Sequence, residues 1–300
     1  MGTPENHYCN QCGEPNALGP LFATTSPRSP LHGVTIESLW ATGGSSLVYQ
    51  ARRGDQTLAL KVLKRDHRDQ PELRARFRFE EDVYRHVQMP GTAHFHGAGE
   101  LRDGSPFLML EFVHGQTLAA AMGCQRRCTL PVAIELSVRL CRLLHRLHLH
   151  GIIHRDVKPS NVMLSGPHAE HMTLLDFGSA CPRHGLTRLT QEGMTIGTPA
   201  YMAPEQAMGE RVDARADLYA VGVILHLALS GTLPFEAPSG FELACMKVMT
   251  NPRSLRERFA HLPIPPTLDD TLMRMLARRP EDRFDSALEA EVALLASTKS

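Results

Sequence analysis

Residues 154–161, His-Arg-Asp-Val-Lys-Pro-Ser-Asn, place three chemically different side chains on one short stretch. Asp156 supplies a carboxylate, Lys158 a cation two residues later, and Asn161 an amide. Phosphoryl transfer from ATP needs such a set: a group that orients the attacking hydroxyl, positive charge against the phosphates, and a ligand for Mg²⁺. The alternative, a helix that ends near 150–151 and continues as a polar turn, leaves this combination unexplained.

Two further motifs follow in order. Residues 174–178, Leu-Leu-Asp-Phe-Gly, place Asp176 at hairpin distance from the first motif. By itself an Asp-Phe-Gly tripeptide usually makes only a turn, but in this order it predicts a second Mg²⁺ ligand. Residues 197–205 then end in Ala-Pro-Glu. Three ordered motifs therefore favour the same chemistry.

A single lysine, Lys61, lies inside the apolar run 58–63. Burying a lysine without a partner is costly, so the partner should be an anion: an ATP phosphate, a carboxylate, or both. The helix expected next carries acidic residues at 80–82. A solvated helix face would account for Arg74, Arg76 and Asp82, but not for Lys61.

Residues 33–297 resemble the catalytic domain of eukaryotic-like serine/threonine protein kinases of the kind common in bacteria. The resemblance implies an α+β, bilobal protein kinase fold, with a small β-rich N-lobe near 33–113 and a larger helical C-lobe near 114–297. A Cys-x-x-Cys tail, residues 1–13, and a flexible linker, residues 14–32, would precede it.

The resemblance implies transfer of the ATP γ-phosphoryl group to Ser or Thr of a protein substrate. Asp156 would accept the hydroxyl proton, and Lys158 would offset charge on the moving phosphoryl group. A lysine at that position is the Ser/Thr pattern rather than the Tyr pattern. Asn161 and Asp176 would hold Mg²⁺, for which Mn²⁺ can substitute.

The nucleotide would be bound by residues of the first 113 positions and by two from the C-lobe. Lys61 would hold the α- and β-phosphates and pair with Glu80, with Glu81 as the alternative. Leu110 would be the gatekeeper, Glu111 and Val113 would offer backbone hydrogen bonds to adenine, and Val48, Ala59 and Met163 would sandwich the ring. The expected nucleotide-binding residues are Ala41, Thr42, Gly43, Gly44, Ser45, Ser46, Val48, Ala59, Lys61, Leu110, Glu111, Val113, Lys158 and Met163.

The glycine-rich loop, residues 41–48, departs from the family pattern G-x-G-x-x-G-x-V. Ala41 and Ser46 replace the two outer glycines. Glycine serves in such loops because the backbone approaches phosphates and adopts unusual φ/ψ values. We expect a weaker grip on the nucleotide with the same fold.

Control is expected in the activation segment. An Arg before the catalytic Asp, here Arg155, commonly pairs with a phosphate on that segment. The candidate residues for that phosphate are Thr187, Thr190 and Thr195. We predict autophosphorylation on Thr190 or Thr195 and place Thr198 near the substrate residue. Glu192 is either a fixed substitute for a phosphate or a solvated loop residue.

Three positions are expected to be structural. Asp217 resembles the helical Asp that braces the catalytic-loop backbone, and Arg283 resembles the Arg that pairs with Glu205 of Ala-Pro-Glu.

The N-terminal tail carries Cys9-Asn10-Gln11-Cys12-Gly13 beside His7. The spacing resembles half of a zinc ribbon, and a closed Zn²⁺ site wants four ligands. His7, His32 or a second chain would have to complete it, and an inert tail is the alternative. Cys124 and Cys128 are interpreted as an incidental pair, and the scattered histidines as surface or core residues.

The bulk composition excludes some classes of function. Lys and Arg number 32, as do Asp and Glu, so nucleic-acid binding has no electrostatic basis. The run 218–229 is too short to span a bilayer and predicts a buried helix. The N-terminus lacks a signal-peptide pattern. We expect a cytoplasmic protein without membrane or nucleic-acid partners, which self-associates during autophosphorylation.

Hydrophobic periodicity supplies the elements. Strands are predicted at 33–41, 47–53, 57–63, 94–100 and 106–112, and helices at 71–88, 131–151, 212–230, 239–250, 268–278 and 285–297.

Two rival functions stay open. A pseudokinase or binding scaffold is supported only by Ala41 and Ser46. A small-molecule kinase of the same fold is disfavoured by the Ala-Pro-Glu element.

Overall fold

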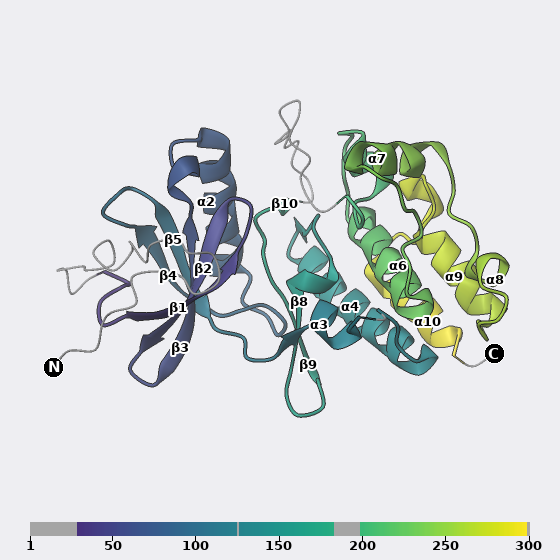
Figure 1. Ribbon diagram of the computed structural model, residues 1–300, viewed down its shortest axis with the longest axis horizontal. Coiled ribbons are helices and arrows are strands. Elements are labelled where there is room, and N and C mark those ends of the chain that lie inside the picture. Colours follow the sequence, from purple (N-terminus) through teal and green to yellow (C-terminus); the bar gives the residue numbers. More distant parts are fainter. Residues whose placement is uncertain (1–28, 125, 183–198, 299–300) are drawn as a thin grey trace. The chain divides into compact units, whose positions relative to one another are not determined.

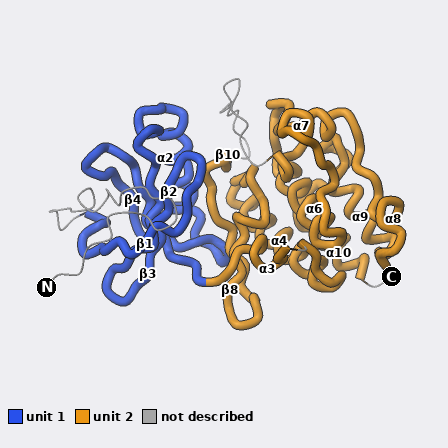
Figure 2. The backbone as a smooth tube through the Cα atoms, viewed as in Figure 1, with its two compact units in different colours: residues 1–114 blue, residues 115–300 orange. Residues whose placement is uncertain are grey.

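The computed structural model describes residues 29–124, 126–182 and 199–298 (Figure 1). The chain divides into two compact units, residues 1–114 and residues 115–300, coloured blue and orange in Figure 2.

The described part of the first unit contains a five-stranded antiparallel sheet. Its strand order is β1-β2-β3-β5-β4. The strands are β1 (Thr35–Thr42), β2 (Ser46–Arg53), β3 (Gln56–Leu63), β4 (Phe95–Glu100) and β5 (Pro106–Glu111). Because successive side chains of a strand point to opposite faces, β3 sends Leu58, Leu60 and Val62 to one face and Ala59 and Lys61 to the other.

The face of the sheet opposite Lys61 is the apolar core of this unit. Its buried members are Leu31, Tyr49, Ala51, Leu58, Leu60, Val62, Leu101, Phe107 and Met109. Leu31 is only 3% exposed, although it lies in the stretch predicted as a linker. Beside it, Pro30 packs over Gly97, where a Cβ would lie 2.9 Å from the Pro30 Cβ. Residues 30 and 31 are therefore anchored on the sheet.

Helix α2 (Pro71–His86) packs beside β4 and β5 (Figure 1). Proline at its first position suits a helix start, because the missing N–H would have no partner there. Its buried residues recur at three- and four-residue intervals and form one face: Leu73, Phe77, Glu80, Val83 and Tyr84. Glu80 is thus on the buried side of the helix.

The second unit is mostly helical. Its helices are α3 (Leu118–Met122), α4 (Leu130–Leu149), α5 (Pro204–Ala207), α6 (Arg215–Ser230), α7 (Gly240–Met249), α8 (Leu255–Arg258), α9 (Pro266–Met275) and α10 (Ala287–Ala296). Helix α6 packs against α4 and α9, and α10 packs against α4. Every residue of α6 from Ala216 to Ser230 is buried, and Gly231, with φ of 79°, ends the helix. Helix α6 is therefore the centre of this unit.

The described part of the second unit also contains five short strands. They are β6 (Gln116–Thr117), β7 (Ile152–Ile153), β8 (Val162–Ser165), β9 (His171–Leu174) and β10 (Cys181–Pro182). Strands β8 and β9 form a hairpin, and β10 pairs with β7 through Cys181 opposite Ile153. The residues between β7 and β8 and those between β9 and β10 are therefore held side by side.

The predicted strands and helices are confirmed, with ends within three residues of those observed. The buried helix predicted at 218–229 is the middle of α6. In the described ranges, no helix combines the length and apolar character needed to cross a membrane.

Candidate active site

The loop between β7 and β8 brings its carboxylate, cation and amide into contact. Lys158 Nζ donates to Asp156 Oδ2 at 2.7 Å. Asn161 Nδ2 donates to the Asp156 carbonyl at 2.9 Å and to its carboxylate at 3.1 Å. Asp156 and Asn161 are both buried. The sequence motif thus forms one compact polar cluster.

Asp217 of helix α6 fixes the backbone of this loop by hydrogen bonds. Its carboxylate accepts hydrogen bonds from the backbone N–H of His154 at 2.9 Å and of Arg155 at 2.8 Å, and lies 2.8 Å from His148 Nε2. Arg155 has φ of 67°, a strained value for a non-glycine residue, and the bond to Asp217 offsets that strain. Burial raises the pKa of Asp217, but the hydrogen bond from His148 and the other donors outweigh it and hold the pKa below its usual value.

Asp176 follows β9 and lies next to this cluster. The N–H of Leu175 donates to the Asn161 carbonyl at 2.8 Å, and the Leu175 carbonyl is 3.0 Å from His154 Nε2. Asp176 itself has φ of 65°, and its Oδ1 accepts from the N–H of Gly178 at 3.2 Å. The hairpin therefore delivers a second carboxylate beside Asn161.

The donor atoms here fit a magnesium ion. A carbonyl can only accept a hydrogen bond, so the contact with the Asp156 carbonyl fixes Asn161 Nδ2 as the donor and Oδ1 as the atom that can ligate a cation. An amide oxygen and the Asp176 carboxylate are the hard oxygen ligands that Mg²⁺ prefers.

In the first unit, Lys61 is paired with Glu80. Lys61 Nζ donates to both carboxylate oxygens, at 2.6 and 2.7 Å. The Lys61 side chain is 12% exposed and that of Glu80 is 2% exposed. The neighbouring Glu81 pairs instead with Arg85 one helical turn away. Of the two predicted carboxylates, Glu80 is therefore the one that contacts Lys61.

The β1–β2 hairpin holds the glycine-rich loop. Its turn is closed by the N–H of Gly43, which donates to the Ser46 carbonyl at 2.9 Å. Ser46 is buried, and Ala41 lies opposite Val48. Neither Gly43 nor Gly44 has a positive φ. The remaining loop positions, Thr42 and Ser45, lie in the same turn region.

The predicted adenine contacts of the first unit share the Lys61 face of the sheet. Val48 lies opposite Lys61, and Ala59 lies opposite Leu110. Glu111 ends β5, and its N–H donates to the His94 carbonyl at 2.8 Å. Val113 follows the strand. Met163 lies in β8 of the second unit, where it is buried.

Trp40 also belongs with these residues and was missed. Its ring meets Phe112 edge to face at 5.0 Å, and Phe112 continues the alternation of Leu110 on the Lys61 face. Trp40 is 56% exposed, which is unusual for so large an apolar side chain. The signal available in the sequence was its place directly before Ala41.

The Ala-Pro-Glu element is tied to helix α6 and to the catalytic loop. Arg283 binds Glu205 through two hydrogen bonds of 2.7 and 2.8 Å, and both side chains are buried. The other guanidinium N–H groups donate to backbone carbonyls, so all five donors have acceptors. Gln206 Nε2 donates to the Arg155 carbonyl at 2.9 Å.

Arg155 offers a place for an anion. Its Nε is buried and has no hydrogen-bond partner among the described residues. The side chain lies against Cys181, whose pKa is raised by burial while the guanidinium opposes that rise. The predicted phosphorylation sites, Thr187, Thr190 and Thr195, lie outside the described residues, as do Glu192 and Thr198.

The zinc prediction likewise lies outside the described residues, since Cys9 and Cys12 precede position 29. In the part of the chain that the structure describes, no three His, Cys, Asp or Glu side chains gather as a metal site. Cys124 and Cys128 are free thiols there.

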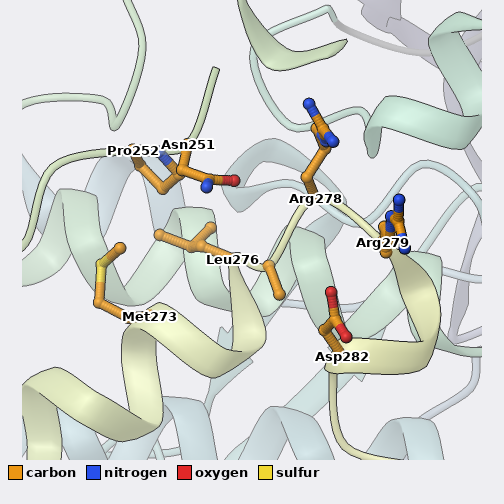
Figure 3. Close-up of a pocket in the computed structure, with 8 residues that line it drawn as sticks. Asn251, Pro252, Met273, Leu276, Arg278, Arg279 and Asp282 are labelled. Atoms are coloured by element: carbon orange, nitrogen blue, oxygen red, sulfur yellow. The ribbon is translucent and has the colours of Figure 1, made fainter. Parts of the chain in front are cut away.

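A separate pocket of about 270 Å³ lies between the end of α7 and the end of α9 (Figure 3). Pro252, Met273 and Leu276 contribute apolar side chains to its lining, and Arg278 and Arg279 contribute guanidinium groups. None of the residues of the catalytic loop lines it.

Comparison with known proteins identifies the family. Residues 36–292 match the protein kinase domain, so this chain belongs to the protein kinase domain family. The serine/threonine-protein kinase PknB of Mycobacterium leprae is 35% identical over 258 residues, which cover 84% of this chain and 41% of the relative. PknB of Mycolicibacterium smegmatis is 33% identical over 277 residues, 90% of this chain and 44% of the relative.

A third relative comes from a different bacterium. The serine/threonine-protein kinase pkn3 of Myxococcus xanthus is 32% identical over 271 residues, which cover 88% of this chain and 50% of the relative. The chain thus spans half or less of the length of these curated relatives.

Proposed function

We propose that this chain is a serine/threonine protein kinase that transfers the γ-phosphoryl group of ATP to a protein hydroxyl. The observation that carries the proposal is the contact of Lys158 and Asn161 with Asp156, beside Asp176. In the reaction the hydroxyl oxygen bonds to the γ-phosphorus, the bond from that phosphorus to the bridging oxygen breaks, and ADP leaves.

Asp156 orients the hydroxyl and takes its proton. Lys158, already 2.7 Å from Asp156, carries positive charge to the moving phosphoryl group. Such preorganised charge acts mainly by stabilising the transition state. The named activity of the relatives and the lysine at 158 support Ser and Thr as acceptors.

Lys61 binds the α- and β-phosphates, and Glu80 fixes the direction of its ammonium group. Asn161 and Asp176 hold Mg²⁺, or Mn²⁺ in its place, which when bound neutralises charge on the phosphates. Val48, Ala59 and Leu110 supply the apolar surface for adenine, with Met163 from β8 and Trp40 in addition.

The proposed regulation by autophosphorylation is supported by Arg155. A buried guanidinium nitrogen with no acceptor among the described residues suits a phosphate on the activation segment. Thr190 or Thr195 is the proposed acceptor, modified by a second copy of the chain. Signalling in the cytoplasm and zinc binding by Cys9 and Cys12 stay predictions from the sequence.

The test is transfer of label from γ-labelled ATP to a generic basic protein and to the chain itself. Wild type should label both, and Asp156→Asn should lose the labelling although it still binds Mg-ATP. Equal labelling by the two proteins, or none by either, would support the binding-scaffold alternative. Mass spectrometry of active wild type should find phosphate on Thr190 or Thr195, and an active preparation without either would refute the regulatory part.

A further inference from the structure

Helix α7 buries one lysine in its last turn. Lys247 is 2% exposed, and its Nζ donates to the carbonyl oxygens of Pro199 at 2.7 Å, Ala200 at 2.8 Å and Met202 at 2.8 Å. These carbonyls belong to the stretch that leads into Ala-Pro-Glu. A single side chain thus holds three peptide groups of four consecutive residues.

The arrangement requires the charged form of the lysine. Only an ammonium has three N–H donors, whereas a neutral amine has two. Burial lowers the pKa of Lys247 to about 7, and the three acceptors favour the proton that burial opposes. In the described residues no carboxylate lies within ion-pair distance of Lys247, so backbone dipoles carry the compensation.

The surroundings hold the same stretch from other sides. Pro199 approaches Gly240, the first residue of α7, so closely that a Cβ there would lie 3.3 Å from its ring. Farther along, Glu205 is fixed by Arg283. The Tyr219 ring of α6 lies 5.5 Å from Lys247 Nζ and 5.0 Å from the Arg283 guanidinium, so two cations contact one aromatic ring.

A hydrogen bond connects the segment after residues 199–202 to the catalytic loop. Gln206, four residues after Met202, donates to the carbonyl of Arg155, which directly precedes Asp156. The nucleotide phosphates are assigned to Lys61, and the metal to Asn161 and Asp176. A shift of residues 199–202 would therefore disturb the acceptor side of the reaction and leave the nucleotide side in place.

We propose that Lys247 is a positioning residue for the protein substrate, because it fixes residues 199–202 as the surface that presents the acceptor hydroxyl to Asp156. This inference rests on the proposed kinase function. It assigns to α7 a part in substrate affinity.

The variants separate charge, hydrogen bonds and size. Lys247→Met removes every donor at similar length, Lys247→Gln leaves a neutral amide with two N–H groups, and Lys247→Arg keeps a cation with several donors. Arg278→Met is the matched control, since it removes an exposed cation that lines the pocket in Figure 3 and donates to the α7 carbonyl of Val248.

The measurement is KM and kcat for a peptide substrate, together with ATP hydrolysis without peptide and the Kd of Mg-ATP. We expect Lys247→Met to raise the peptide KM by about tenfold or more, because charge-assisted hydrogen bonds are lost. The peptide KM of Lys247→Gln should lie between those of wild type and Lys247→Met. The peptide KM of Lys247→Arg and of Arg278→Met should stay within about threefold of wild type. The Kd of Mg-ATP and the ATP hydrolysis without peptide should change by less than about twofold.

A folded Lys247→Met with an unchanged peptide KM would overturn the proposal, as would equal losses in peptide KM and Mg-ATP affinity. If the Met variant does not fold, the Gln variant decides on the same criterion. Amide hydrogen exchange of residues 200–206 separates this outcome from failure of the kinase assignment itself. Exchange there should speed up in Lys247→Met whether or not any substrate is phosphorylated, and unchanged exchange would refute the positioning role.

Discussion

Two lysines with little exposed surface, one in each unit, have their charge compensated in different ways. Lys61 meets a carboxylate, Glu80, and keeps a 12% exposed side chain. Lys247 meets three carbonyl oxygens and is closed off. A carboxylate partner leaves an ammonium able to bind a further anion, whereas backbone carbonyls only fix the chain to which they belong. The first arrangement suits a ligand, and the second suits a scaffold.

The largest effect should separate these two lysines. Lys61→Met should lower kcat/KM for ATP by about 100- to 1,000-fold, because a cation that stabilises the phosphates is lost. Lys247→Met, assayed at saturating peptide, should change the same constant by less than about twofold. Steady-state kinetics with varied ATP checks both, and a similar loss in the two variants would remove the distinction.

The buried ion pair of Glu205 and Arg283 gives a second contrast, measured as stability. Arg283→Met leaves a buried carboxylate without its partner and should cost about 3–5 kcal/mol. The double variant, with Glu205→Met added, should recover part of that loss because no charge then stays buried. Urea unfolding of the full chain measures both, and a cost below about 1 kcal/mol for the single variant would contradict the expected role of the pair.

His226 extends the comparison to a buried group that stays neutral. Its Nδ1 lies 2.8 Å from the Thr232 carbonyl, and its Nε2 has no hydrogen-bond partner among the described residues. Burial lowers its pKa to about 4, below the usual 6.5. The unfolded chain therefore binds a proton more readily, and stability present above pH 6.5 is lost as the pH falls toward 4.

The expected loss at His226 is about 3 kcal/mol across that interval. Urea unfolding between pH 4 and 7.5 measures it against His226→Phe, which should lack this part of the pH dependence. Identical slopes in the two proteins would show that His226 does not titrate in this way.

The smallest effect concerns Trp40. Trp40→Ala should raise the KM for ATP by about fivefold, since an aromatic contact of this kind is worth about 1 kcal/mol. Trp40→Phe should stay near wild type. As the only tryptophan of the chain, it should also change its fluorescence when Mg-ATP binds. A silent fluorescence signal with an unchanged KM would remove Trp40 from the nucleotide site.

The two lysines also show what a sequence can reveal. Lys61 was recognisable because a charge interrupts an apolar strand, where alternation buries it or pairs it. Lys247 stands in a helix, where a lysine ordinarily extends to solvent. Leu243, four residues earlier, is buried on the same face, while Phe241 and Met249 are exposed. Large apolar residues of α7 on its exposed side were therefore the one signal in the sequence that its lysine could be buried.

The other differences between the sequence predictions and the structure have simpler physical reasons. Helices α5 and α8, of four residues each, are too short to show a period, and α5 is fixed by tertiary contacts such as the Glu205 pair. The choice between Glu80 and Glu81 depends on helix phase, which a single sequence sets only approximately. The buried face of α2 decides it.

The packing of Pro30 and Leu31 on the sheet has a practical consequence for anyone who shortens this protein. A version trimmed to start at residue 33, where the family resemblance begins, would expose the apolar surface of the sheet that Pro30 and Leu31 cover and would favour aggregation. A version that starts at or before residue 29 keeps this surface covered.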